Sequence, residues 1–392
     1  MESKMLNLLT KTKPWMVASL LVATSIFGQN ACAKPCPPKP CPPKPCPQPC
    51  PQPCPPTQMC DQDPCCPAWP TPVLNAAYNY PARIQTRCPW DFFAYGSFLY
   101  WQPIQENMDL AFRTVASDDP EVFVVDGSYI NMDFSYKPGF KVGIGMDFAH
   151  DNWDSSLEYT WFHSSHSQSA SVGLTEHLLA LRGNPTTLAT AWNSISQKWR
   201  LNMDFLDLDL GRTYYVGTKL TFRSAFGARG TWIRQRLYSS FANSVNLTEA
   251  SATQKSNAWA VGPRASLKTN WNIGEGFRAY GNGALDILYT RYTKLTDNTS
   301  MGFVNAATPI EVTNFSQSKL GYLRPHTELV LGIGWGTYLD CNNWYMDFSA
   351  DYGFQVFWNQ NMFRHLTGLV AGLVPTGDLF VHGLTATFRL DF

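Results

Sequence analysis

Apolar side chains recur at every second position over long stretches of this chain. Residues 140–149 alternate Phe, Val, Ile, Met and Phe with Lys, Gly, Gly, Asp and Ala, and residues 344–358 continue such a pattern over fifteen positions. Successive side chains of a β-strand point to opposite faces, so each stretch predicts a strand with one apolar and one polar face. This period of two is the main constraint on what the chain can fold into.

The lengths of the predicted strands favour a barrel that crosses a membrane. A tilted transmembrane strand needs about 9–11 residues, more than the usual strand of a soluble protein. Tryptophans stand at the strand ends, as in the aromatic girdles of such barrels. They are Trp101, Trp153, Trp161, Trp259, Trp271, Trp335, Trp344 and Trp358.

The connections between predicted strands alternate in length. Tight ones are expected at 150–152, 216–218, 272–276 and 340–343, and long polar ones at 165–197, 241–257, 295–317 and 359–377. Short periplasmic turns opposite long outer loops are typical of outer-membrane barrels. A short helix around 175–181, folded into the pore, is expected in the first long connection.

We therefore predict an all-β fold, a transmembrane antiparallel β-barrel of about 12 strands within residues 90–392. The strands are expected at 91–102, 107–115, 122–135, 137–149, 153–164, 198–215, 219–238, 258–271, 277–294, 319–338, 343–358 and 379–392. If 107–135 is an outer loop, the number falls to about ten, and strands within the long loops would raise it to as many as about sixteen.

Residues 1–33 are predicted to be a secretory signal peptide. The apolar run 15–27 follows three lysines and precedes Ala31-Cys32-Ala33, an A-x-A pattern that predicts cleavage after Ala33. A lipoprotein acylated at Cys32 is the weaker alternative. The mature chain is expected outside the cytoplasm, where disulfides form. The formal net charge is zero and there is no basic run, so nothing indicates binding to nucleic acid.

Residues 34–89 are predicted to be a disordered, extended periplasmic tail rich in cysteine and proline. Proline at nearly every second position of 34–54 fixes φ and removes amide donors, which favours a polyproline-II rod. Cysteines on such a rod lie about 12–15 Å apart, and a disulfide needs Cα atoms within about 7 Å, so neighbours cannot pair while it stays extended. Crosslinking to other chains is preferred over random pairing in a flexible linker and over metal binding. The candidate crosslinking residues are Cys36, Cys41, Cys46, Cys50, Cys54, Cys60, Cys65, Cys66, Cys88 and Cys341.

Charged residues at the polar positions of the strands are candidates for a pore lining. Acids and bases are nearly balanced, which predicts weak ion selectivity, but bases gather in 219–294 and acids in 137–164 and 343–358. A basic wall opposite acidic walls would set an electric field across the pore. The alternative is that these charges pair across strands and each pair contributes little free energy. The candidates are Lys141, Asp147, Glu158, Asp207, Asp209, Lys219, Arg223, Arg229, Arg264, Lys268, Arg278, Arg324, Glu328, Asp347 and Asp351, with Asp154, Asp286, Arg389 and Asp391 as further inward positions.

Short segments of the chain resemble one protein family. Segments 98–103 (FLYWQP), 138–145 (PGFKVGIG) and 151–154 (DNWD), with the closing strand, resemble the Legionella and Chlamydiales major outer-membrane protein-like porin family. The resemblance covers residues 90–392 and implies an outer-membrane porin, often oligomeric and sometimes disulfide-crosslinked. The cysteine–proline tail departs from the family pattern, which leaves a separate role in envelope anchoring open.

The last strand, 383–392, alternates apolar and polar residues and ends on Phe392. It resembles the terminal strand of bacterial outer-membrane barrels, in which an aromatic last residue serves as the assembly signal. This resemblance marks Leu384, Phe388, Leu390 and Phe392 as the expected signal.

The expected function is that of an outer-membrane porin for small hydrophilic solutes and ions, with the tail adding to envelope integrity. The alternative is a structural or adhesive surface protein with little channel activity. No enzyme is expected, because hydrolase, metalloprotease, phosphate-loop and dinucleotide motifs are absent and His163, His166 and His326 lie in ordinary strand or loop contexts. No cofactor or metal is expected. Expected partners are outer-membrane lipid, the barrel-assembly machinery, and further copies (a homotrimer among them) or other cysteine-rich envelope proteins through disulfides.

Overall fold

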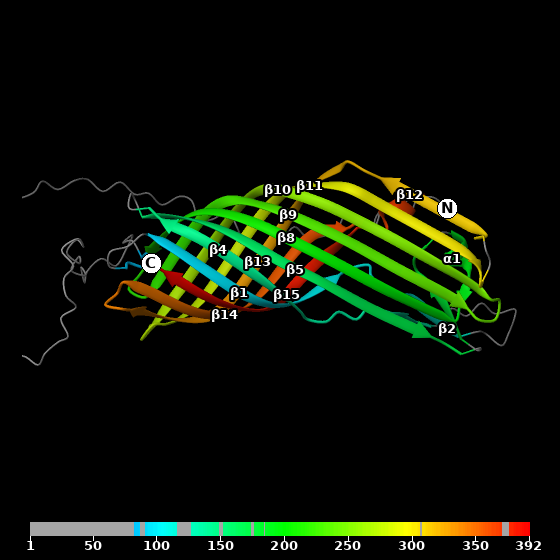
Figure 1. Ribbon diagram of the computed structural model, residues 1–392, viewed down its shortest axis with the longest axis horizontal. Coiled ribbons are helices and arrows are strands. Elements are labelled where there is room, and N and C mark those ends of the chain that lie inside the picture. The colour runs from blue at the N-terminus through cyan, green and yellow to red at the C-terminus, as the bar shows by residue number, and fades with distance from the viewer. Residues whose placement is uncertain are drawn as a thin grey trace, which may run out of the picture. The chain divides into compact units, whose positions relative to one another are not determined.

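Ten long antiparallel strands close into a barrel in the computed structural model (Figure 1), which describes residues 82–86, 91–115, 127–148, 152–173, 176–183, 185–305, 308–370 and 376–392. The barrel strands are β1 (Phe92–Gln105), β4 (Lys137–Asp147), β5 (Trp153–Ser171), β8 (Ser194–Tyr215), β9 (Leu220–Asn243), β10 (Thr248–Gly274), β11 (Phe277–Phe303), β13 (Leu320–Leu339), β14 (Trp344–Asn361) and β15 (Gly377–Asp391). Each strand pairs with the next barrel strand along the chain, and β1 pairs with β15 from Phe93↔Asp391 to Gln105↔Leu379. The predicted fold class, an all-β antiparallel barrel, is confirmed.

The barrel has ten strands because two of the twelve predicted strands leave it. In the described part of the ranges 107–115 and 122–135, the strands are β2 (Ala111–Val115) and β3 (Gly127–Ile130), which form a separate four-stranded sheet with β6 (Glu176–Ala180) and β7 (Ala191–Trp192). Strands of four or five residues are too short to cross a membrane. The expected helix around 175–181 is wrong, since that range holds β6, and the described helices are α1 (Pro185–Ala189) and α2 (His365–Val370). Neither of these helices is long and apolar enough to cross a membrane.

Several ranges predicted as long loops are instead continuations of strands. β10 begins at Thr248, so β9 and β10 are joined by only 244–247, and β12 (Glu311–Gln317) pairs with the outer part of β11. At the opposite end the predicted tight turns are present at 216–219, 275–276 and 340–343. Glu275 and Gly276 have φ of 52° and 83° there, the left-handed conformation that two-residue hairpins use.

The two faces of the barrel wall change character along β5, β8 and β9. In β8, Leu206, Leu208 and Leu210 face outward and are exposed, whereas Trp199, Leu201, Met203 and Phe205 face inward and are buried. The apolar residues therefore change parity between Phe205 and Leu206. β5 changes parity between Trp161 and Phe162, and β9 between Trp232 and Ile233.

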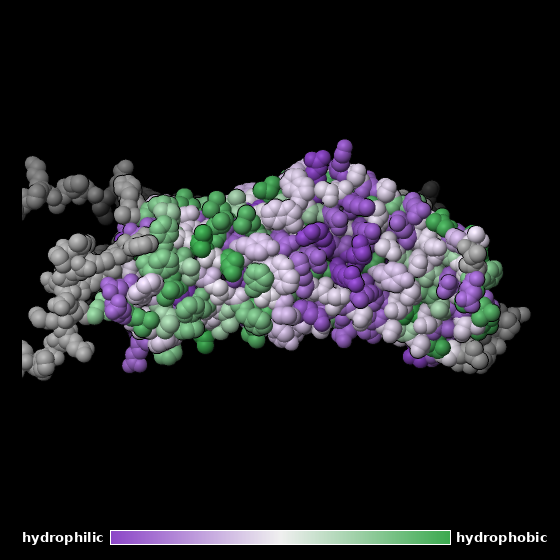
Figure 2. Space-filling view, in the orientation of Figure 1, coloured by the Kyte–Doolittle hydropathy of each residue, from purple (hydrophilic) through white to green (hydrophobic). Residues whose placement is uncertain are grey.

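The half of the barrel that carries the C-terminus thus has an apolar outer face, seen as the hydrophobic area in Figure 2. On β10 this outer face runs from Trp259 to Trp271. The other half has an apolar inner face, against which the connecting segments pack. The four-stranded sheet packs on β8, β9 and β10 through Leu178, Trp192 and Phe241, and α2 packs on β10 and β11 through Leu366 and Tyr292.

Candidate functional site

A cavity of about 780 Å³ occupies the lumen of the half-barrel that carries the C-terminus. It extends into the barrel from the turn residues Glu275 and Gly276 and from Gly336, Thr337 and Tyr338 near the end of β13, and inward side chains wall it. Of the fifteen candidate pore residues, the structure places twelve in its lining: Lys141, Asp147, Glu158, Asp207, Asp209, Arg223, Arg264, Lys268, Arg278, Glu328, Asp347 and Asp351. Whether they line a conducting pore stays a prediction.

The other three candidates lie elsewhere. Lys219 is exposed in the turn before β9, which begins one residue later than predicted. Arg324 is buried among Tyr292, Tyr322 and Met362 and is not part of the cavity lining. Arg229 is 2% exposed and lies behind the cavity lining, where it contacts the lining residues Asp207 and Glu328.

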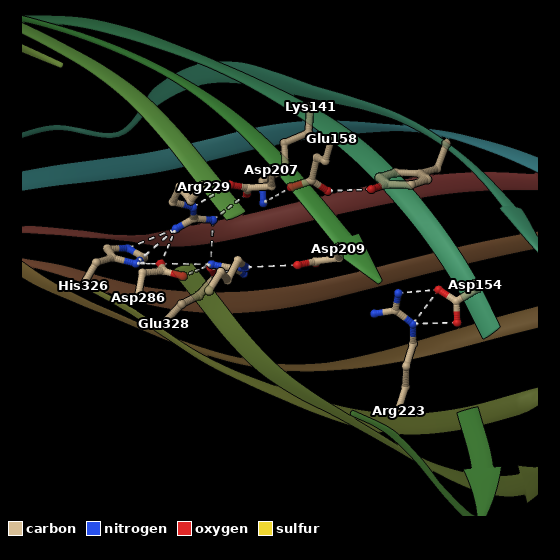
Figure 3. A network of polar contacts seen from close by, with 12 residues as sticks. Lys141, Asp154, Glu158, Asp207, Asp209, Arg223, Arg229, Asp286, His326 and Glu328 are labelled. Atoms are coloured by element: carbon tan, nitrogen blue, oxygen red, sulfur yellow. Dashed lines mark hydrogen bonds and ion pairs between the residues drawn. The ribbon is translucent and has the colours of Figure 1, made fainter. Parts of the chain in front are cut away.

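Arg229 holds a layer of charged groups across the lumen (Figure 3). Its guanidinium binds both carboxylate oxygens of Asp207 at 2.6 Å and lies 3.2 Å from Asp286 and 3.4 Å from Glu328. Arg264 contacts the same Asp286 and Glu328 at 3.2 and 3.0 Å. The five residues come from β8, β9, β10, β11 and β13, so the layer ties five strands together. We call it the charged layer.

His326 joins the charged layer to an apolar one. Its fully buried ring is within hydrogen-bonding distance of Asp286 and packs at a tilt against Phe357, with 4.2 Å between the ring centroids. Phe357 contacts Phe205 at 5.4 Å, and the Arg229 guanidinium lies over Phe205 at 5.5 Å. The charged layer is thus covered on its outer side by the apolar side chains of Phe205 and Phe357.

The apolar layer fills the lumen beyond this point. It combines inward residues of eight strands, such as Leu99, Met203 and Ile233, with Met108, Met132 and Phe363 from connecting segments. Sequence reasoning missed this layer because it assigned every apolar face to lipid. The change of parity within β5, β8 and β9 was the signal that would have shown it.

Two arginines fasten the connecting segments over the apolar layer. Arg182, which follows β6, is buried and donates to the carbonyl of Asn107 and, at 3.3 Å, to Gln254 of β10. Arg364 lies 3.4 Å from Asp109. Burial, aided by Arg364, lowers the pKa of Arg182 to about 9, so its guanidinium stays charged at neutral pH.

Most charges that line the cavity are paired across neighbouring or facing strands. Arg223 binds Asp154 and Arg278 binds Asp347, while Lys141 lies 3.2 Å from Glu158. The arrangement resembles the paired alternative more than two opposed walls. Within the described residues Lys268 forms no ion pair, which leaves it as an unneutralised cation of the lining. The described part of the chain contains no group of three His, Cys, Asp or Glu side chains that would hold a metal ion.

The family model of the Legionella pneumophila major outer membrane protein precursor matches residues 85–392. The chain belongs to this family. The match covers the whole barrel and confirms the resemblance inferred from the sequence. Membership of the major outer membrane protein family, together with the barrel, places the protein in the outer membrane. No curated protein matches the sequence.

Several solved outer-membrane barrels are similar in fold. The outer membrane protease OmpT from Escherichia coli is 9% identical, with 79% of this chain and 99% of its own covered and a TM-score of 0.39. The P. putida toluene transporter TodX is 8% identical, with 78% and 91% covered and a TM-score of 0.28. A Pseudomonas aeruginosa FadL homologue is 8% identical, with 77% and 90% covered and a TM-score of 0.26.

One expectation from the sequence is corrected here. We expected that the chain is not an enzyme, on the ground that it lacks familiar catalytic motifs. The match to OmpT contradicts that exclusion, because a barrel that aligns with 79% of this chain is a protease. The likeness is one of fold and assigns no reaction to this major outer membrane protein.

Proposed function

We propose that the protein is a channel for small hydrophilic solutes and ions across the outer membrane. The observation that carries the proposal is the cavity of about 780 Å³, whose lining is polar and charged although the outer face of the same strands is apolar. A lumen of this kind accepts hydrated solutes, and its paired charges give little net preference for either sign of ion.

The charged and apolar layers make the described conformation a closed one. Part of the apolar layer comes from the connecting segments through Met108, Met132 and Phe363, and not from the barrel wall. Because connecting segments have fewer strand pairings than the wall, their displacement is the cheaper route to opening the lumen. We infer that conduction requires the described parts of the connecting segments, residues 106–115, 127–136 and 362–370, to move outward.

A second candidate is supported by the same apolar layer. A lumen filled by side chains from wall and connections suits a structural or adhesive surface protein with little channel activity. Under this alternative the long outer strands β8–β11 serve as a display surface, and the cavity is only the unfilled part of the interior.

Conductance in planar bilayers tests the proposal. Channel openings with weak selectivity are expected for the purified protein, and Lys268→Gln should shift that selectivity toward cations because it removes the unpaired cation of the lining. Lys219→Gln is the matched control, since Lys219 lies outside the cavity. A folded barrel that passes no ions in bilayers and no solute in liposome-swelling assays would favour the structural alternative.

The N-terminal part of the chain extends the proposal. We propose that residues 1–33 are removed on export after Ala33, and that the tail 34–89 crosslinks the barrel to further copies or to other cysteine-rich envelope proteins. All the candidate cysteines except Cys341 lie outside the described residues. Cys341, in the turn between β13 and β14, is disulfide-bonded, so its thiol is not available to another chain. Insertion by the barrel-assembly machinery, with Phe392 as part of its signal, is proposed on the resemblance alone.

A further inference from the structure

Strands β5, β8, β9, β10 and β11 carry a group of basic residues on their outer face. Strand register aligns these outward positions in rows across the wall. One row is Ser165–Arg200–Arg236–Lys255–Thr296, and the next is His163–Asn202–Arg234–Asn257–Lys294. Below them comes Trp161–Asp204–Trp232–Trp259–Arg291, and above them Ser167–Lys198–Tyr238–Thr253–Asn298. We call the outward positions of these four rows the basic band.

The basic band has a strong excess of positive charge. It contains seven cations, which are Lys198, Arg200, Arg234, Arg236, Lys255, Arg291 and Lys294, and one carboxylate, Asp204. The full chain has equal numbers of basic and acidic residues, 30 of each, so the excess is local. Figure 2 shows hydrophilic residues gathered in a band across the middle of this face, beside the hydrophobic area.

Asp204, the one carboxylate of the basic band, pairs with a single arginine, Arg234. Asp204 lies 2.9 Å from Arg234 and also accepts from Tyr159 at 3.0 Å, within 3.3 Å of the His163 ring. The Asp204 side chain is 12% exposed and that of Arg234 is 56% exposed, so Arg234 keeps free donors toward the outside. Within the described residues, Arg200, Arg236 and Lys255 form no ion pair at all.

Three like charges directly opposite one another need an explanation. Arg200, Arg236 and Lys255 are register partners on three adjacent strands, where side chains stand about 5 Å apart at Cβ and like charges destabilise the sheet. Together with Arg234 they line a surface hollow of about 330 Å³. Guanidinium and ammonium donors that converge on one hollow suit a phosphate group, whose bound charge removes the repulsion.

The position of the hollow identifies the source of the phosphate. Directly below the basic rows lie Trp161, Trp232 and Trp259, then the apolar positions of the outer face such as Leu206 and Leu208. Tryptophan marks the interface of a membrane, so the basic band lies at the level of lipid headgroups, on the side away from the C-terminus (Figure 1). We propose that the basic band binds the phosphorylated headgroup of an outer-leaflet lipid, whose acyl chains lie along the apolar face below.

Lipid binding by purified protein tests this site. The full mature chain in detergent is titrated with diphosphorylated lipid A and with the same lipid after removal of its phosphates. Wild type should bind the phosphorylated form at least about tenfold more tightly. Each cation near an anionic lipid surface contributes about fivefold in affinity, so Arg200→Gln/Arg236→Gln should weaken binding by about 25-fold.

The matched control removes two exposed cations outside the band. Lys219→Gln/Lys319→Gln should leave affinity within about twofold of wild type. Heat-modifiable migration on gels checks that each variant is folded, and Lys255→Gln gives a milder second variant. Equal binding of both lipids, or an equal loss in the control, would overturn the proposal. So would full competition by millimolar inorganic phosphate, which would indicate a site for the free ion.

Discussion

Replacing Arg229 by methionine tests whether the charged layer is as dry as its contacts imply. Arg229 is 2% exposed and faces Asp207, Asp286 and Glu328 at 2.6, 3.2 and 3.4 Å. Removing one partner of a buried ion pair costs about 3–5 kcal/mol, because the other charge stays buried and unpaired. Arg264 still contacts two of these carboxylates, so Asp207 bears most of the loss. We expect Arg229→Met to lower the free energy of unfolding by about 3–5 kcal/mol.

Equilibrium unfolding in urea from detergent micelles, followed by tryptophan fluorescence, measures that loss. Arg234→Met is the matched control, because Arg234 also binds an aspartate, at 2.9 Å, but its side chain is 56% exposed. An exposed pair contributes about 0–1 kcal/mol, so the control should lose no more than that. Adding Asp207→Asn to Arg229→Met should recover part of the loss, since it removes the stranded charge. Equal losses in Arg229→Met and Arg234→Met would refute a dehydrated layer and indicate that water enters it.

Three further outcomes follow from the apolar layer, the last strand and the tail. Phe363→Ala should raise single-channel conductance because it thins the apolar layer. The control Phe348→Ala, at a position that faces lipid, should leave conductance unchanged. Unchanged conductance in Phe363→Ala would place the constriction elsewhere. Phe392→Asp should lower the fraction of heat-modifiable, folded barrel in the membrane, because the Phe392 ring packs on Trp344 at 5.7 Å; normal surface levels would contradict this. Non-reducing gels should show oligomers that reductant dissolves and that disappear when the five cysteines of 36–54 become serine, and a monomer in both gels would exclude crosslinking.

The strand segments that face lipid could be predicted from the sequence because large apolar residues alternate in them with charged or polar ones. In β10, Val261 and Leu267 alternate with Arg264 and Lys268, and the predicted strand 258–271 lies wholly within the observed one. The outer part of the same strand was missed because its inward residues are Ala250, Ala252 and other small or polar side chains. Small inward residues leave room for the four-stranded sheet, but in the sequence they look like a polar loop.

Partner choice was the part of the site that a single sequence does not contain. The inward positions of Arg229 and Glu328 follow from parity, but their contact joins residues 99 positions apart and depends on the order in which five strands meet. The same holds for β2, which has the alternation of a strand yet pairs with β6 and not with β1. Alternation determines which face a side chain takes and leaves the neighbour on that face open.

A single level along the barrel accounts for both the closed lumen and the basic band. At the step from Leu206 to Phe205 in β8, and at Trp232 to Ile233 in β9, the apolar residues move from the outer to the inner face. On the lipid side of that level the outer face must be apolar, so the polar residues are left to line a wet cavity. Beyond it the outer face meets headgroups and water, which frees the outward positions for cations such as Arg200. The inward positions then require apolar cover, and they receive it from the connecting segments. The apolar layer is therefore where the wall first leaves the hydrocarbon, and any opening movement of those segments takes place at the level where the lipid phosphates lie.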